Sequence, residues 1–163
     1  MAAATGGHEP DKYIRVMDGD GWRVVLPEGL NAKPHKAWGY DSGSIARGWI
    51  GEAPVTVIVQ TKRLETGFNE WAREITRFWL EHDDPRRVEL GGATDAIRID
   101  GFIEFDGLGA KDDRERCTTL LAKRAGVGFS LTVRSRPEDG IEQELEPIVA
   151  SFELVDPSRN TFR

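Results

Sequence analysis

The chain has little of what metal and thiol chemistry requires. Its 163 residues include one cysteine, Cys117, and three histidines, His8, His35 and His82, none at a metal-ligand spacing from another histidine or the cysteine. A single cysteine excludes an intramolecular disulfide and a multi-thiolate metal site, and it suits a reducing compartment. We therefore predict no metal and no cofactor.

Positive charge and long apolar runs are also scarce. The formal net charge is −6, and no stretch approaches the roughly 20 apolar residues of a membrane span. A nucleic-acid binder needs a basic face that releases counterions from the phosphates. We expect neither nucleic-acid binding nor membrane insertion, although a local basic patch would lie at Arg86-Arg87 or at Arg114, Arg116, Lys123 and Arg124.

The ends of the chain differ from its middle. Residues 1–11 are small, polar and glycine-rich, without the basic region and apolar segment of a signal peptide. We expect a cytoplasmic protein, although removal of a native leader would leave the same sequence. Residues 1–11 are interpreted as a flexible N-terminal arm, 12–155 as a single domain and 156–163 as a C-terminal tail.

Period-two patterns and turn residues predict most of the strands. The segment 55–60 is rich in β-branched residues, and Ile58 adds an apolar group to its polar face, so we expect a central strand from Val55 to Arg63 that is covered on both sides. Glu28 to Ser44 is predicted to be an irregular loop. The other predicted strands form a hairpin at 13–17 and 22–26, a strand at 45–50, and a three-stranded meander at 96–106, 114–123 and 129–134.

Two segments have the periodicity of helices. From Phe68 to His82, apolar residues recur at spacings of three and four, and Pro85 is expected to end this helix. A second helix is predicted to begin at Pro137 and to reach Phe152. Pro147 lies inside it and should bend or divide it, because proline removes a backbone donor.

These elements predict an α+β fold, in which a mostly antiparallel sheet of about six to seven strands is flanked by helices. The segment Gly21-Trp22-x-Val24-x-Leu26-Pro27, the central strand with its amphipathic helix, the meander and the ending Ile148 to Phe152 resemble the Mog1p/PsbP-like superfamily of α/β/α sandwiches. The resemblance spans Tyr13 to Val155. It implies a protein-binding or assembly role, since such proteins include a nuclear-transport GTPase partner, photosystem assembly subunits and bacterial toxin chaperones, but fold does not fix function.

Cys117 is the one candidate nucleophile, and a nucleophile requires a histidine brought close by the fold. If the meander pairs Glu104 with Arg116, Cys117 faces Ile103 on the inner side of the sheet. We therefore expect Cys117 to be a small buried residue, and we predict no catalytic residue.

A row of acids, Asp100, Glu104 and Asp106, falls on one face of a strand. Two such carboxyl groups can form an acid/base or cation-binding pair. The register above also sets Glu104 beside Arg116 and Asp106 beside Arg114, and we favour this cross-strand charge pairing.

Large aromatic residues in and beside the irregular segment Glu28 to Gly51 are the remaining functional signal. Loops that carry such residues are frequent binding surfaces. The candidate binding residues are His35, Trp38, Tyr40 and Trp49. The alternative is that the loop folds over the sheet and buries them.

Taken together, these features favour a non-enzymatic cytoplasmic domain that binds another protein or acts as a chaperone or assembly factor. The alternative is a small-molecule-binding protein or an enzyme with an unfamiliar site between sheet and helix. A third hypothesis is a subunit of a homo-oligomer, which requires an apolar self-complementary patch.

Overall fold

The structure, a computed structural model, describes residues 15–104 and 114–156. The predicted N-terminal arm, Asp106 and most of the predicted C-terminal tail lie outside these ranges. The first hairpin is confirmed: β1 (Arg15–Gly19) pairs with β2 (Trp22–Leu26). The short strand β11 (Glu153–Leu154) joins the other edge of β2 and completes a three-stranded antiparallel sheet.

Within the described residues the main sheet has eight strands, more than the six to seven predicted, and all its pairs are antiparallel. The meander is confirmed as β8, β9 and β10. The strands, in spatial order, are β3 (Leu30–Pro34), β4 (Ser42–Ile50), β5 (Ala53–Arg63), β10 (Val127–Ser135), β9 (Arg114–Arg124), β8 (Asp95–Glu104) and β6 (Glu81–His82), with β7 (Arg86–Arg87) also on β8.

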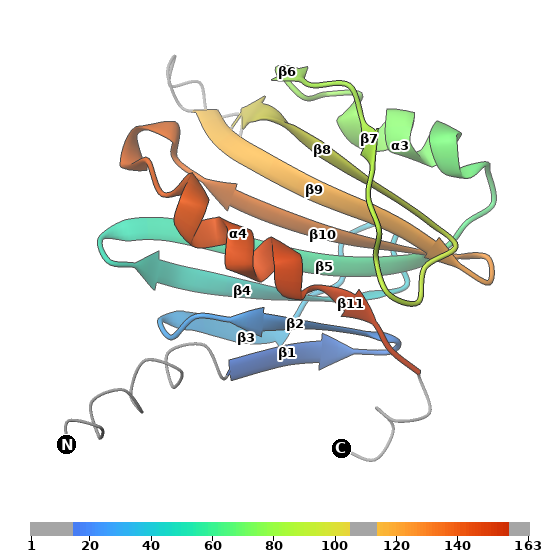
Figure 1. Cartoon of the computed structure of the whole chain (residues 1–163), viewed down its shortest axis with the longest axis horizontal. Helices are drawn as coiled ribbons and strands as arrows, with labels where there is room; N and C mark the ends of the chain where they lie inside the picture. Colours follow the sequence, from blue (N-terminus) through green and yellow to red (C-terminus); the bar gives the residue numbers. More distant parts are fainter. Residues whose placement is uncertain (1–14, 105–113, 157–163) are drawn as a thin grey trace.

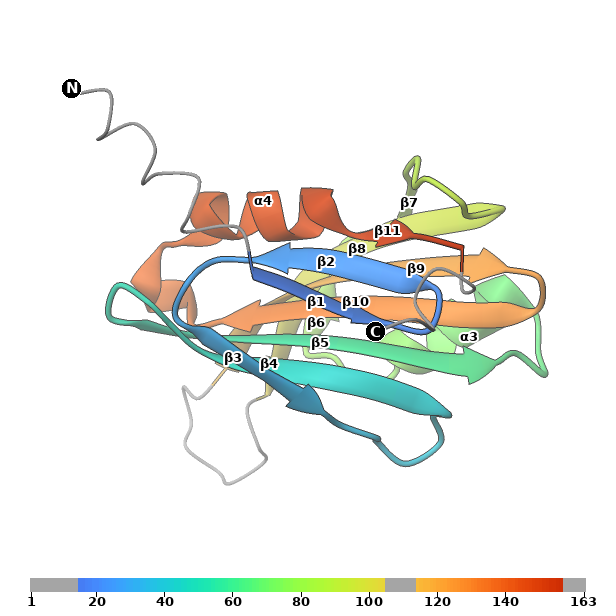
Figure 2. The ribbon, with the colours of Figure 1, turned by 90° about the horizontal axis from the view of Figure 1, so that it is seen from below.

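Two helices cover opposite faces of the main sheet (Figures 1 and 2). Helix α4 (Glu142–Ser151) and the small sheet share one face, where Trp22, Leu131 and Ile148 belong to one buried apolar cluster. Helix α3 (Phe68–Thr76) lies on the other face, where Trp71 packs in a second, smaller cluster. The arrangement is a sheet between two covering layers of unequal size.

The segment Glu28 to Ser44 is not wholly irregular as predicted, because it contains β3. Four of the five residues of β3 are exposed and one of them is Pro34, so the strand has no period-two burial pattern to detect. It forms because β4 comes very close: a Cβ on Gly48 would overlap the carbonyl oxygen of Gly29. Tertiary contact therefore determines this strand, not local preference.

The prediction of one helix from Phe68 to His82 is wrong in length, because α3 ends at Thr76. The Thr76 hydroxyl donates to the carbonyl of Ala72, and the chain then leaves the helix for the sheet edge. There the Leu80 N–H donates to the Phe102 carbonyl at 2.9 Å, and Glu81–His82 forms β6. Phe78, which would continue the apolar stripe, is 84% exposed.

The second helix is divided, but at Gly140 and not at Pro147. Residues Pro137–Asp139 form a 3₁₀ turn, and Gly140 follows with a left-handed φ of 62°, which favours glycine. Helix α4 then runs without interruption through Pro147, which is exposed.

The predicted pairing of Glu104 with Arg116 is wrong by two residues: Glu104 lies opposite Arg114, and Phe102 lies opposite Arg116. A shift of two keeps every side chain on its predicted face. Cys117 is therefore buried as expected, although it lies opposite Gly101 and not Ile103.

The central strand β5 is covered completely on one face only. Val55, Val57 and Val59 are buried in the larger cluster, but Thr56 and Ile58 on the other face are half-buried. The prediction that both faces of this strand are covered is wrong, because α3 packs mainly over β8 and β9. The sheet consequently has an open strip near the turn between β4 and β5 and over the facing part of β10, whereas Ile45, farther along the same face of β4, is buried.

The close approach of β3 to β4 gives a test of the fold. The substitution Gly48→Ala is expected to lower the free energy of unfolding by about 2–3 kcal/mol, because the new methyl group would overlap the Gly29 carbonyl. Chemical denaturation measures this change. Gly91→Ala is the control, since no heavy atom lies within 4 Å of the added carbon, and a change within about 0.5 kcal/mol is expected. Equal stability of the two variants would contradict the β3–β4 pairing.

Candidate functional site

A groove with a volume of about 810 Å³ occupies the open strip beside the β4–β5 turn. Its residues come from five neighbouring strands, β3, β4, β5, β10 and β9, and from positions just before β3 and just after β10. The side chains that shape it are Asn31, Arg47, Trp49, Thr56, Glu115, Arg134 and Arg136. The groove is a candidate binding site because an exposed aromatic ring and several arginines converge on it.

Strand register arranges these side chains in two rows. Thr56 lies opposite Arg47 on β4 and opposite Arg134 on β10, so the three side chains share one face. In the second row Pro54 lies opposite Trp49. The floor of the groove is therefore β5, and β4 and β10 form its walls.

The arginines of the groove differ in their partners. Arg134 forms an ion pair with Glu115 at 3.4 Å, with the two side chains 22% and 11% exposed. Arg136 donates to both carboxylate oxygens of Asp139, at 3.0 and 3.2 Å. Arg47 is exposed, and within residues 15–104 and 114–156 no carboxylate lies within 4.0 Å of it that would form an ion pair. Among the arginines of the groove, Arg47 is therefore the one whose positive charge no carboxylate of the described residues balances.

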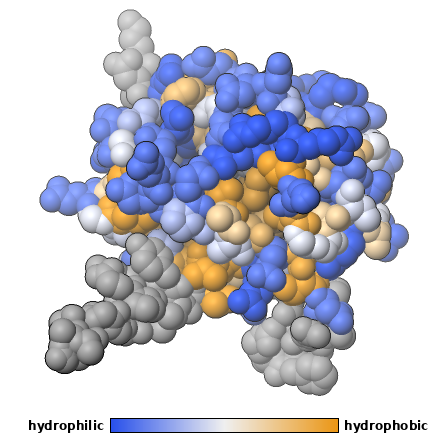
Figure 3. All heavy atoms as spheres, viewed as in Figure 1, coloured by the Kyte–Doolittle hydropathy of each residue, from blue (hydrophilic) through white to orange (hydrophobic). Residues whose placement is uncertain are grey.

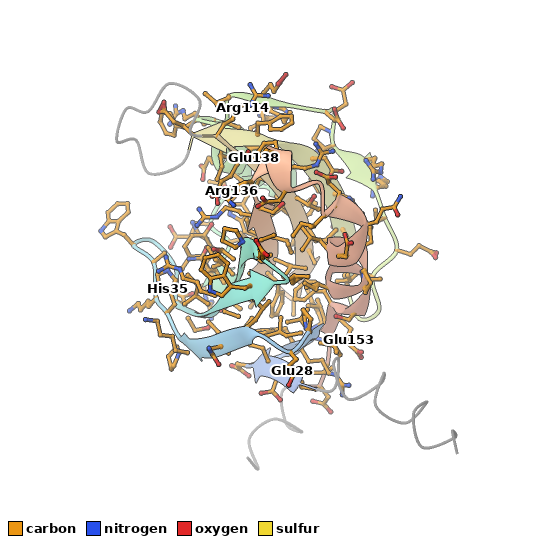
Figure 4. All side chains as sticks on the ribbon, turned by 90° about the vertical axis from the view of Figure 1, so that its left-hand side faces the viewer. Glu28, His35, Arg114, Arg136, Glu138 and Glu153 are labelled. Carbon is orange, nitrogen blue, oxygen red and sulfur yellow. The ribbon has the colours of Figure 1, made fainter. Side chains whose placement is uncertain are left out.

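The four predicted binding residues do not gather at one site. Trp49 is 57% exposed and lines the groove, but His35, Trp38 and Tyr40 lie in the connection between β3 and β4, at the opposite end of β4. Figure 4 looks nearly along the strands, so the separation of His35 from the groove along β4 lies in its line of sight. Only Trp49 therefore belongs to the groove.

The two aromatic residues of the β3–β4 connection differ in solvent exposure. Trp38 is 98% exposed. Tyr40 packs beside the α3 cluster, with the Lys62 ammonium 5.7 Å from its ring centre, and burial raises the pKa of its hydroxyl. The prediction that this segment carries exposed aromatic residues holds for Trp38, and the alternative of burial describes Tyr40.

The sequence alone did not identify the arginines of the groove as binding residues. Alternation along β4 places Arg47 and Trp49 on one face, which the sequence pattern shows. The pairing of Arg47 with Arg134 across β5 depends on the register of three strands, and no local pattern contains that information.

Cys117 lies in the sheet with a neutral thiol. Burial raises its pKa to about 12, and its sulfur lies 3.7 Å from the Thr119 hydroxyl. Gly101 of β8 lies between Cys117 and His82, which are its opposite residues on β9 and β6. The His82 Nδ1 is hydrogen-bonded to the carbonyl of Asp83. The thiolate needed for nucleophilic attack is disfavoured at this position.

Of the predicted acid row, Asp100 forms part of a network that holds α4 on the sheet. Arg98 donates to Asp100 at 3.0 Å and to both oxygens of Glu146 on α4, and the Thr118 hydroxyl donates to Asp100 at 2.6 Å. Although burial alone raises the pKa of Asp100, these hydrogen bonds hold it below its ordinary value. The hydrogen bond from Arg98 likewise lowers the pKa of Glu146. The space beside this network is only about 50 Å³.

Two of the other surface hollows lie beside the helices. One, of about 1030 Å³, runs between α3 and the β7–β8 edge, where Arg87 pairs with Asp95 at 3.7 Å. The alternative hypothesis, a ligand bound between sheet and helix, would place the ligand in this hollow. The other, of about 500 Å³, lies on the α4 face, where hydrophobic residues appear in patches among hydrophilic ones (Figure 3). It follows a seam of the core, between α4, β2 and the segment 88–91.

Neither a metal-binding cluster nor a membrane-spanning helix is present in residues 15–104 and 114–156. In these two ranges, no three histidine, cysteine, aspartate or glutamate residues are grouped to hold a metal ion. Neither helix in the same ranges has the length and apolar character needed to cross a membrane.

No protein-family model matches this chain, and no curated protein matches it. Among solved structures, the fold is similar to the solution structure of cyanobacterial PsbP (CyanoP) from Synechocystis sp. PCC 6803, with a TM-score of 0.51 over 88% of this chain and 94% of that chain. The chain has a PsbP-like fold. The resemblance seen in the sequence is thereby confirmed, and at 10% sequence identity the likeness concerns the fold alone.

The network around Arg98 predicts how stability depends on pH. Because the folded state lowers the pKa of Glu146, its ionised form stabilises the fold above the ordinary glutamate pKa, and this contribution is lost as the pH falls through the lowered value. Glu146 is about half exposed, so Glu146→Gln is expected to cost only about 0.5–1 kcal/mol at pH 7 and less near pH 3. Denaturant titrations at both pH values measure this difference.

The control for this prediction is Glu144→Gln on the same helix, which is expected to stay within about 0.5 kcal/mol of the wild type. A cost for Glu146→Gln that is the same at both pH values would contradict the ionic role of the network.

Proposed function

We propose that this protein is a non-enzymatic domain that binds another protein, and that the groove lined by Arg47, Trp49 and Arg134 is its docking site. The observation that carries the proposal is the exposure of Trp49 beside Arg47, a charge without a carboxylate partner in the described ranges. Tryptophan and arginine are the residues most enriched at the energetic centres of protein interfaces.

The surroundings of the groove support binding better than catalysis. The acid that contacts its arginines on the sheet, Glu115, is already paired with Arg134. The thiol of Cys117 has a raised pKa, and Asp100 lies on the other face of the sheet, in contact with α4 through Arg98. The PsbP-like fold fits a domain of this kind. A cytoplasmic location and a chaperone or assembly role are part of the same proposal.

The proposal is tested by photo-crosslinking in cells. The residue p-benzoylphenylalanine replaces Trp49 in one strain and Trp38 in another, and covalent adducts are identified by mass spectrometry. We expect a protein adduct from position 49 and none of the same identity from position 38, because the two positions lie at opposite ends of β4. An adduct with a second copy of this chain would instead support the homo-oligomer hypothesis.

The partner found in this way is then purified and titrated by calorimetry. Trp49→Ala is expected to weaken its binding about tenfold or more, as at other interface centres. Trp38→Ala, the matched control, also removes an exposed indole and should change the affinity by less than about twofold. Weakening by Trp38→Ala alone would place the docking site on the β3–β4 connection and overturn the proposal.

A further inference from the structure

The groove has the repeat distance of an extended polypeptide. Arg47 and Trp49 stand two residues apart on β4, as do Thr56 and Pro54 on β5, so its two rows are about 6.6–6.8 Å apart. Side chains on one face of any extended peptide recur at the same interval. A peptide that lies along β5 can therefore place successive same-face side chains against successive rows.

The width of the groove also favours an extended segment. Arg47 and Arg134 flank Thr56 on its two neighbouring strands, so their Cα atoms are two strand spacings apart, roughly 9.5 Å. A helix with its side chains is about 10–12 Å in diameter, which exceeds the room between these two walls. An extended chain fits over the small floor that Thr56 and Pro54 provide.

The two rows differ in chemistry. The first contains Arg47, which has no ion-pair partner in the described ranges, and Arg134, whose charge is matched by Glu115, so the row as a whole is positive. The second contains the half-exposed ring of Trp49 beside Pro54, and Arg136 near it is matched by Asp139. The first row therefore suits a carboxylate, and the second an apolar side chain.

The neighbouring sheet edge is poorly suited to bind the same segment by strand addition. The Gly29 carbonyl accepts from Trp49 and the His35 N–H donates to Gly43, so alternate residues of β3 bond to β4 and positions 32 and 34 point outward. Pro34 has no N–H to offer there, and such a residue discourages pairing at an exposed edge.

We propose that the groove recognises an extended segment of the partner in which an aspartate or glutamate stands two residues from a large apolar side chain. This inference rests on the proposed function and adds the chemistry and conformation of the bound segment. The carboxylate lies against Arg47 and Arg134, and the apolar side chain lies against Trp49.

Synthetic peptides in a Gly/Ser background test the inference by NMR titration of the ¹⁵N-labelled full chain, which detects weak binding. One peptide carries Asp-Ser-Phe, the second Asn-Ser-Phe and the third Asp-Ser-Ser-Phe. We expect shifts of residues in β4, β5 and β10 with the first peptide, and about fivefold weaker binding of the other two, close to the upper value of an exposed ion pair.

The matched variants are Arg47→Gln and Arg63→Gln, the latter at an exposed end of β5 away from the groove. Arg47→Gln is expected to remove the preference for Asp over Asn, and Arg63→Gln to retain it. Equal affinity for all three peptides, no binding, or shifts centred on Trp38 or on α3 would overturn the inference. The proposed function would stand separately if crosslinking at position 49 still captured a protein whose contacting segment lacks this pattern.

Discussion

The register of β4, β5 and β10 is the constraint on which the rest of the structure depends. It places Ala46, Val57 and Val133 in one row on the buried face, and it thereby places Arg47, Thr56 and Arg134 in one row on the open face. A slip of one residue would exchange the two faces and turn two arginines into the core. The burial of small apolar side chains on one side thus determines the order of charged and aromatic groups on the other.

The groove exists because the two covering layers are unequal. Helix α4 and the small sheet close one face, and Ser151 on α4 accepts a hydrogen bond from the Val25 N–H of β2 at 2.8 Å. Helix α3 is short, because the chain after Thr76 returns to the sheet edge to form β6. Trp71 packs tightly on Gly128, where a Cβ would lie 2.8 Å from its ring, but the helix leaves the groove near the β4–β5 turn open.

Strands and helices with a clear period could be predicted from the sequence, whereas boundaries and partners set by tertiary contact could not. The meander and the first hairpin followed from alternation and turn residues, and Cys117 was assigned to the buried face even though its opposite residue was wrong. Strand β3 was missed because Pro34 and its exposed neighbours give no local signal. Of the binding site, Trp49 was named from its chemistry, but its neighbours Arg134 and Arg136 come from the far part of the chain and meet it only through β5.

The most direct test of this account is the backbone NOE pattern of Thr56 in the isotopically labelled protein. We expect inter-strand contacts from the backbone protons of Thr56 to those of both Arg47 and Arg134. Contacts from Thr56 to Gly48 or to Val133 as its directly opposite residues would show a shifted register, and they would contradict both the core and the groove described above.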